Sequence, residues 1–477
     1  MNFRMIKNIL GWILIFEAAF MLIPLTTAAI YWEDAFFSYL LTIGICLLFG
    51  FALIWKKPAD KTLYSREGFV IVSLSWVFLS IFGSLPFMFS GEIPSFIDAF
   101  FETVSGFSTT GSSILTSLDN MSHASLIWRS FTNWIGGMGV LVFVMAFVPL
   151  SGGNNMHIMK AESPGPSVSK LVPRVKTTAL ILYIIYISLT FLEFIFLVCG
   201  EMNAFEAICS SFSTAGTGGF GIKNDSFLSF SSYSQIVVTV FMLLFSINFA
   251  SYYFVLLGRF KEAFTGEVKC FIGIVVSAIV LITLNTRALF STLGDAIKHV
   301  SFTVASIIST SGFATVDFDR WPELSRVLIL ILMFVGACAG STGGGIKISR
   351  IIIMIKSVIK EIHLMIHPKQ VKKVTIDKHS IEHEVVRATN VYMVCYLVVF
   401  AVSLILISIS NHDIVTSFSA VTTTINNIGP GLEMIGPTKN FAFFNPFEKI
   451  VLCFNMLAGR LELFPMLLLF SPVTWRK

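Results

Sequence analysis

Residues 108–112 read Ser108-Thr109-Thr110-Gly111-Ser112, a polar strip between two long apolar runs near 68–89 and 126–149. A short amphipathic stretch at 95–107, too short to cross a membrane, precedes the strip. Three later places repeat the arrangement, with the strips Thr217-Gly218-Gly219-Phe220, Thr310-Ser311-Gly312-Phe313 and Asn426-Asn427-Ile428-Gly429-Pro430. Internal repeats constrain architecture more strongly than local detail does. We therefore predict four units, each consisting of a helix, a pore loop and a second helix.

The composition places these units in a lipid bilayer. Hydrophobic residues make up 55% of the 477 residues, charged residues only 13%, and the mean hydropathy is +0.81. Soluble domains average about 25% charged residues, and an apolar run of about 20 residues spans a hydrocarbon core. The basic residues stand in short loops rather than in one cluster, which argues against a nucleic-acid partner. Membrane lipid is the expected surrounding.

The apolar runs predict an all-α polytopic protein with about ten transmembrane helices around a central pore. Two helices are expected before the repeats, and each repeat contributes two more. The expected spans are 8–30 and 36–54, then 68–89 with 126–149, 177–199 with 233–257, 268–285 with 326–357, and 387–408 with 447–471. The corresponding divisions are an N-terminal hairpin at 1–66 and pore repeats at 67–160, 161–260, 261–375 and 376–477.

The distribution of lysine and arginine predicts the orientation. Cytoplasmic loops of membrane proteins carry an excess of these residues. If the N-terminus is cytoplasmic, most of the 33 basic residues fall on that side, including the 56–66 loop and the 347–387 stretch. We therefore expect both termini inside and all four pore loops open to the outside. After Arg4 and Lys7 the first apolar run continues without a convincing cleavage site, so we expect it to be retained as a helix.

The four strips are the expected ion site. Non-helical backbone at membrane depth is tolerated only where it is buried or lines a water-filled path. Four strips that converge on one axis would present rings of backbone carbonyls, which replace the hydration shell of a cation. Glycine permits backbone angles that direct these carbonyls inward. The candidate ion-binding residues for K⁺ are Thr109, Thr110, Gly111, Thr217, Gly218, Gly219, Thr310, Ser311, Gly312, Asn427, Ile428 and Gly429.

The second span of the third repeat contains five glycines within the ten residues 336–345. Such a stretch cannot remain a stable helix in lipid without neighbours. We predict an intramembrane gating loop beneath the strips, formed by Gly336, Gly340, Gly343, Gly344, Gly345 and Lys347. Gly340 and Gly345 also have the spacing of a phosphate-binding loop, but Ile346 stands where that motif requires lysine.

Arg460 lies near the middle of the last span, where an arginine is costly unless it faces a polar interior. It could hold the glycine loop shut through backbone carbonyls or impose an electrostatic barrier; a purely structural ion pair is the alternative. Acidic residues precede the short helices, and these either form a ring of negative charge or cap the helices. They are Asp98, Glu102, Glu201, Glu206, Asp295 and Asp413.

Two other function classes compete with a pore. A cation-coupled symporter with broken helices would also show interrupted spans, but inverted repeats and several intramembrane charges would be more typical of it. An enzyme would need a convergent catalytic set, and neither a Ser-His-Asp nor a cysteine arrangement stands out. We expect no tightly bound cofactor.

The chain resembles the Trk/Ktr/HKT superfamily of potassium transporters, and specifically its bacterial TrkH type. The two N-terminal spans favour this type over the Ktr type, and the resemblance covers essentially the whole chain. It is carried by Phe107-Ser108-Thr109-Thr110-Gly111, Asn133-Trp134-Ile135-Gly136-Gly137-Met138-Gly139, Ser213-Thr214 with Thr217-Gly218-Gly219-Phe220, Gly340-Ser341-Thr342-Gly343-Gly344-Gly345-Ile346-Lys347 and Asn426-Asn427-Ile428-Gly429-Pro430-Gly431.

The resemblance implies a potassium uptake protein of the bacterial inner membrane. Such proteins are homodimers with one pore per protomer, gated by a cytoplasmic ring of nucleotide-binding, TrkA-like domains, so any nucleotide belongs to that partner. The filter glycines would be Gly111, Gly312, Gly429 and either Gly218 or Gly219, because Ala215-Gly216 departs from the expected pattern. Glycine at the first filter position suits potassium, whereas some relatives with serine there favour sodium.

Overall fold

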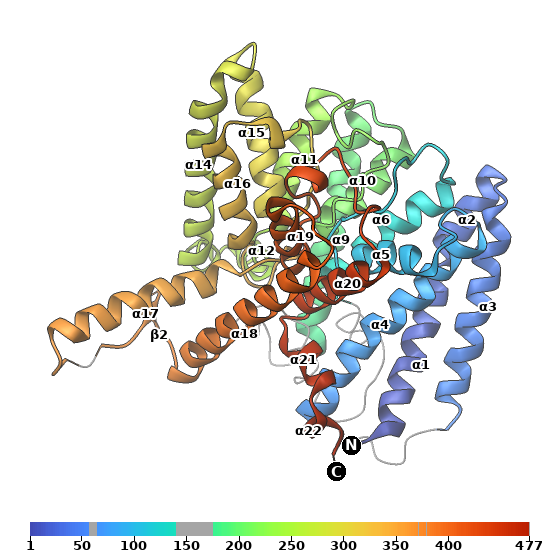
Figure 1. Cartoon of the computed structure of the whole chain (residues 1–477), viewed down its shortest axis with the longest axis horizontal. Helices are drawn as coiled ribbons and strands as arrows, with labels where there is room; N and C mark the ends of the chain where they lie inside the picture. Colours follow the sequence, from blue (N-terminus) through green and yellow to red (C-terminus); the bar gives the residue numbers. More distant parts are fainter. Residues whose placement is uncertain (57–63, 140–174, 371, 378, 477) are drawn as a thin grey trace.

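The computed structural model describes residues 1–56, 64–139, 175–370, 372–377 and 379–476. It is an all-helical bundle in which both ends of the chain lie at the same end (Figure 1). Among the described residues, six helices are long and apolar enough to cross a membrane, or seven if one strongly bent pair counts as a span. The all-α membrane architecture is therefore confirmed.

The N-terminal hairpin packs against the first repeat. Its two arms contact each other through Gly11 and Gly50, which allow the two backbones to approach closely. The hairpin consists of α1 (Phe3–Phe20), α2 (Leu22–Tyr31) and α3 (Ala35–Ile54), and the first repeat of α4 (Ser65–Phe89), α5 (Phe96–Phe107) and α6 (His123–Met138). The predicted continuation of the second span to 149 lies outside the described residues.

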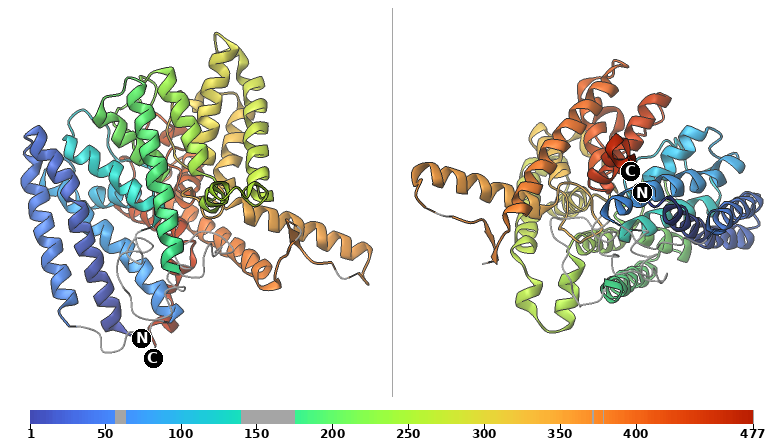
Figure 2. Two further views of the ribbon diagram at one scale, coloured as in Figure 1. Left: turned by 180° about the vertical axis from the view of Figure 1, so that it is seen from behind. Right: turned by 90° about the horizontal axis from the view of Figure 1, so that it is seen from below.

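The other three repeats follow the same order around the bundle (Figures 1 and 2). The second consists of α9 (Val175–Cys199), α10 (Ala204–Gly216), α11 (Ser232–Phe245), α12 (Phe249–Leu256) and α13 (Phe260–Ala263). The third consists of α14 (Gly266–Thr286), the 3-10 turn Arg287–Leu289, α15 (Leu293–Ile308), the 3-10 turn Phe318–Arg320, α16 (Glu323–Val335) and α17 (Ile348–Ile366). The antiparallel strands β1 (Thr375–Ile376) and β2 (His379–Ser380) lead to the fourth, which consists of α18 (His383–Ser408), α19 (Ile414–Asn426), the 3-10 turn Glu433–Ile435, α20 (Pro446–Arg460), α21 (Phe464–Phe470) and α22 (Pro472–Trp475).

The four short helices α5, α10, α15 and α19 begin in the same way. Each N-cap side chain accepts a hydrogen bond from the backbone N–H three residues later, which satisfies one of the free donors of a helix start. The caps are Ser95, Asn203, Thr292 and Asp413. The four helices are largely buried in the centre of the bundle, where the flanking helices enclose them.

Two predicted continuous spans are broken. In place of one helix at 233–257, α11 and α12 meet at a bend of 92°, and in place of one at 447–471, α20 and α21 are separated at Leu461–Leu463. Both breaks adjoin the glycine-rich stretch 336–347. The carbonyls of Phe245 and Ser246 accept from Thr342 and Cys338, and Glu462 pairs with Arg350 of α17. At the first break, backbone donors of the glycine-rich stretch take the carbonyls that the helix leaves free, and at the second an ion pair links the break to α17.

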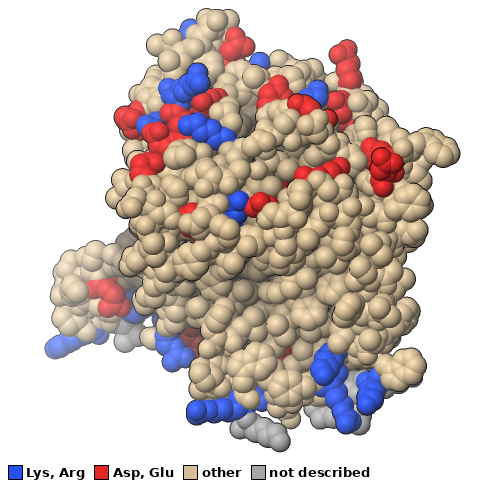
Figure 3. Space-filling view, turned by 45° about the vertical axis from the view of Figure 1, so that its right-hand side comes forward, with Lys and Arg blue, Asp and Glu red and all other residues tan. Residues whose placement is uncertain are grey.

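The charged side chains are unevenly distributed between the two ends of the bundle. Lys and Arg occupy the lower rim beside the chain ends, while the upper rim carries both signs and a band without charge separates them (Figure 3). Helix α17 projects sideways from the bundle, above the level of the chain ends (Figure 2). This pattern agrees with a membrane-embedded band and a basic cytoplasmic side.

Candidate functional site

The four polar strips share one backbone conformation. In each strip, a left-handed residue at the end of the short helix is followed two positions later by a left-handed glycine. The left-handed residues are Thr109, Thr217, Thr310 and Asn427, and the glycines are Gly111, Gly219, Gly312 and Gly429. This register aligns Gly219, rather than Gly218, with the glycines of the other strips.

The strips interlock in a closed ring. A Cβ on Gly111 would lie 2.2 Å from the carbonyl oxygen of Gly218, and one on Gly219 would lie 1.8 Å from that of Ser311. Likewise, a Cβ on Gly312 would lie 2.1 Å from the oxygen of Ile428, and one on Gly429 would lie 2.8 Å from that of Thr110. Each glycine therefore touches the carbonyl that precedes the glycine of the next strip. The sequence predicted convergence, and the structure supplies the order: one, two, three, four and back to one.

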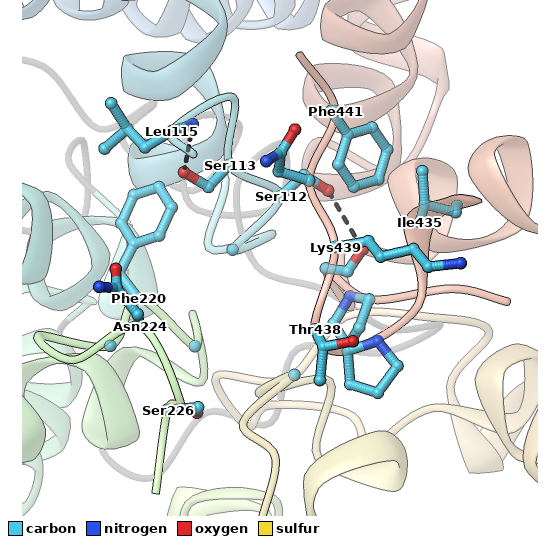
Figure 4. Close-up of a pocket in the computed structure, with 18 of the residues that line it drawn as sticks. Ser112, Ser113, Leu115, Phe220, Asn224, Ser226, Ile435, Thr438, Lys439 and Phe441 are labelled. Atoms are coloured by element: carbon cyan, nitrogen blue, oxygen red, sulfur yellow. Dashed lines mark hydrogen bonds between the residues drawn. The ribbon is translucent and has the colours of Figure 1, made fainter. Parts of the chain in front are cut away.

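The four glycines also line one outward-facing cavity of about 150 Å³ (Figure 4). Ser112, Phe220 and Pro430, each of which follows the glycine of its strip, form part of its wall, and Lys439 also lines it. The lining residues include Arg129, Lys223 and Lys439 but no Asp or Glu, counted over the part of the chain that the structure describes. Among the described residues, none of the acidic residues named from the sequence lines this cavity.

The acidic residues have other positions. Asp98, Glu206 and Asp295 lie in the first turns of α5, α10 and α15, and Asp413 caps α19. The hydrogen bond from the Thr292 hydroxyl holds the pKa of Asp295 below its usual range. For Asp413, burial opposes ionisation, but hydrogen bonds from the hydroxyl and backbone of Thr416 outweigh it and lower its pKa. These residues stabilise helix starts, as the capping alternative stated.

Glu102 is the exception, because it lies buried behind the first strip. Its carboxylate accepts hydrogen bonds from the Ser113 hydroxyl at 2.9 Å and the Ile114 N–H at 3.0 Å. Arg129 of α6 pairs with it at 2.8 Å, with only 3% of the arginine side chain exposed. The guanidinium also lies 4.2 Å from the centre of the Phe220 ring and donates to the Gly221 carbonyl at 3.3 Å. This ion pair fastens the first strip to the second.

Sequence reasoning placed Glu102 at the outer surface and did not pair it with Arg129. The sequence did contain a signal for this pair, because Glu102 and Arg129 are charged residues in largely uncharged segments of the same repeat. A charge at such a position needs a partner.

Side-chain hydroxyls and amides support the strips from behind. Ser108 bonds Thr110 at 2.7 Å, and Ser309 bonds Ser311 at 2.8 Å. Asn427 donates to the Thr110 hydroxyl at 2.9 Å and so joins the fourth strip to the first. In the third repeat, a ring nitrogen of His299 lies 3.0 Å from the Thr315 hydroxyl.

The glycine-rich stretch is non-helical, as predicted, and lies directly beneath the strips. The N–H of Gly344 donates to the Thr310 hydroxyl at 2.7 Å. A Cβ on Gly343 would lie 2.8 Å from the Ser309 carbonyl oxygen, and one on Gly344 would lie 2.5 Å from that of Asn426. Gly336 and Gly345 pack against each other where the chain enters and leaves the loop. The loop thus meets the inner side of the third and fourth strips.

Two basic side chains contact this loop through backbone carbonyls. Arg460 donates to the Thr342 carbonyl at 2.7 Å and to the Gly137 carbonyl at 2.6 Å, so it bridges the loop and the end of α6. Lys347 donates to the Gly343 carbonyl within the loop. Glu462, which follows Arg460 closely in the sequence, pairs instead with Arg350.

The arrangement can desolvate and coordinate a cation. The ring presents carbonyl oxygens, and the four short helices end at the strips, so the negative ends of their dipoles are directed at the ring. The loop beneath would obstruct passage toward the basic side. Such a combination suits selective passage of a monovalent cation rather than catalysis.

Comparison with known proteins gives the same answer. Residues 37–476 match the family described as TrkH, cation transport protein. The chain belongs to the TrkH family. It is similar to the Trk system potassium uptake protein TrkH of Escherichia coli (strain K12), with 37% identity over 100% of both chains. It is 34% identical, again over 100% of both chains, to the protein of the same name from Halomonas elongata.

A solved structure extends the similarity to the fold. The crystal structure of the potassium transporter TrkH from Vibrio parahaemolyticus matches with a TM-score of 0.89 and 33% identity, covering 100% of both chains. The TrkH resemblance inferred from the motifs is thereby confirmed. The chain is a multi-pass membrane protein of a cation transport family and not an enzyme.

Proposed function

We propose that the chain carries potassium, and rubidium with it, inward through the ring formed by the four strips. The observation that carries the proposal is the closed sequence of contacts in which each strip's glycine abuts a carbonyl of the next strip. A ring of fixed carbonyl dipoles favours a cation that gives up its water readily. The similar proteins are described as a potassium uptake protein and a potassium transporter, which supports potassium as the ion.

The filter in this proposal comprises the twelve residues predicted from the sequence, with Gly219 as the glycine of the second strip. The loop 336–347 is the gate, and Arg460 holds it against the end of α6. Each of the repeats, with the boundaries given above, contributes one strip, and the N-terminal hairpin lies outside the ring. Both termini are cytoplasmic, and the membrane is the bacterial inner membrane.

Regulation in this proposal comes from the cytoplasmic side. The protein acts as a homodimer, each protomer with its own pore, and a TrkA-like ring of nucleotide-binding domains releases the gate. Support comes from the basic lower rim and from the projecting α17, which continues directly from the loop. Nucleotide binds the partner and not this chain.

Cation flux into liposomes that contain the purified protein tests the proposal. Potassium and rubidium should enter well ahead of lithium, and Gly312→Ser should weaken this discrimination because its side chain would meet the Ile428 carbonyl. Gly273→Ser is the matched control, since a Cβ at Gly273, on α14 of the same repeat, meets nothing within 4 Å.

Absence of cation flux, with and without the cytoplasmic partner, would refute the pore. Potassium uptake that requires a proton or sodium gradient would instead indicate a cation-coupled symporter.

A further inference from the structure

A small hairpin lies between α17 and α18 (Figure 1) and contacts the start of α14 through Asp377 and Gly266. At its turn, Asp377 adopts a left-handed backbone with φ of 49°. Both carboxylate oxygens of Asp377 accept from the Gly266 N–H, at 2.9 and 3.0 Å. Gly266 is the first residue of α14, where backbone donors lack helical partners and the helix dipole favours a negative charge.

The residue after Gly266 connects α14 to the glycine loop. The carboxylate of Glu267 accepts from the Ala339 N–H at 2.7 Å and from the Ser349 N–H at 3.2 Å. Ala339 lies within the loop, and Ser349 lies in the first turn of α17. One side chain therefore holds both the loop and the helix that follows it.

The hairpin is also tied to α17. Lys356 donates to the Thr375 carbonyl at 2.7 Å, and Ile381 N–H closes the base of the hairpin on the Val374 carbonyl at 2.8 Å. A displacement of the hairpin would therefore act on α14 through Asp377 and on α17 through Lys356. Both helices lead to the loop.

We propose that Asp377 and Glu267 are positioning residues that couple the cytoplasmic hairpin to the intramembrane loop. With the hairpin seated, Asp377 fixes the first turn of α14, and Glu267 keeps Ala339 and Ser349 in place beneath the strips. Withdrawal of the hairpin frees that turn and lets Glu267 release the loop. The inference rests on the proposed function in that it takes the loop to be the gate.

A purely structural role for Asp377 would be that it caps α14 and nothing more. Removal of its side chain would then lower the stability of the first turn of α14. The conformation of the loop, which Asp377 reaches only through Glu267, would not change. The two roles differ in whether the loop responds.

The test compares Asp377→Gly, Glu267→Gln and the double variant in liposomes without the cytoplasmic partner. Glycine keeps the left-handed turn accessible while removing the carboxylate. Glu262→Gln is the matched control, because Glu262 is an exposed acid of the preceding helix that pairs only locally with Arg259. We expect each single variant to raise potassium flux at least about fivefold, with the potassium-to-lithium ratio unchanged. The double variant should match the single variants, because both act through one connection.

A second measurement does not depend on flux. Amide hydrogen exchange in 336–349 should be faster in Asp377→Gly than in the wild type and the control. Loop exchange and flux at the level of the control, or a lowered flux, would overturn the coupling.

Wild-type conduction and the Gly312→Ser effect are measured in the same preparations. If the wild type conducts and Gly312→Ser weakens selectivity, but Asp377→Gly alters neither flux nor exchange, the coupling is refuted and the proposed pore is retained. If the wild type conducts no cation, the proposed function fails, and the exchange measurement still decides whether the hairpin holds the loop.

Discussion

The four strips and the glycine loop are both irregular, glycine-rich and buried at the centre of the bundle, yet they are held in opposite ways. The strips interlock backbone against backbone around a closed ring, and each glycine is confined by a neighbouring carbonyl. The loop has backbone contacts as well, but it is also attached through charged side chains from other elements, including Arg460 and Glu267. A hydrogen bond from a side chain can be broken by moving one element, whereas the ring cannot open without moving all four.

In the proposed function, this difference separates selection from regulation. A filter must keep its carbonyls in place for many ions, and four mutually supporting strips provide that rigidity. A gate must have a second arrangement of similar free energy, and attachment at a few separate points permits one. The predictions below test each half of the comparison.

The largest effect is expected at the closest contact of the ring. Gly219→Ala would place a Cβ 1.8 Å from the Ser311 carbonyl oxygen and would strain a left-handed position. We expect the potassium-to-lithium flux ratio to fall at least about tenfold, equivalent to about 1.4 kcal/mol of discrimination. Flux of each ion into liposomes measures it, with Gly273→Ala as control. An unchanged ratio would show that the strips are not mutually confined.

The buried ion pair behind the ring should come next. Glu102→Gln leaves Arg129 buried without its counter-charge, a change that typically costs about 3 kcal/mol or more of unfolding free energy. We expect a lower Tm together with weaker ion selectivity, because the pair joins the first two strips. Asp295→Asn, which disturbs an exposed acid near Lys298, is the control. If Tm falls and selectivity stays at the wild-type value, the pair stabilises the fold without shaping the ring.

Weakening the attachment of the loop should raise the ion flux rather than reduce selectivity. Arg460→Gln removes the charged donor that joins the Thr342 and Gly137 carbonyls. We expect potassium flux without the cytoplasmic partner to rise about fivefold, while the potassium-to-lithium ratio remains that of the wild type. Arg320→Gln, at an exposed arginine of the outer side, provides the comparison. A changed ratio would place Arg460 in the selection step and so weaken the division drawn here.

The smallest effect concerns the support of the third strip. Partial burial and the nearby Lys298 lower the pKa of His299, whereas Asp295 opposes the shift. The unfolded chain therefore takes up a proton on this histidine at a higher pH than the folded protein does, so stability falls as the pH drops below about 6.5. Because the imidazole is only partly buried, the loss should be under about 1 kcal/mol. The shift in Tm between pH 7 and pH 5 should be smaller in His299→Gln than in the wild type. An equal shift in the two proteins would show that this histidine is not the source of the pH dependence.

Much of the fold was predictable because it depends on local physics. Hydropathy located the long apolar segments, and glycine marked the places where helices cannot continue. The predicted short helix at 95–107 corresponds to α5, and the predicted interruption at 336–345 corresponds to the break between α16 and α17. Each of these features follows from residues that are neighbours in the chain.

The sequence by itself therefore determined the membrane class, the four repeats and the positions of the strips and the loop. Only the tertiary structure decided which strip meets which, why Gly219 rather than Gly218 takes the glycine position, and that Glu102 pairs with Arg129. It also decided the breaks after Phe245 and Arg460, where the loop and α17 supply distant partners. The physical reason is that propensity, capping and hydropathy act along the chain, whereas these contacts join segments that only folding brings together.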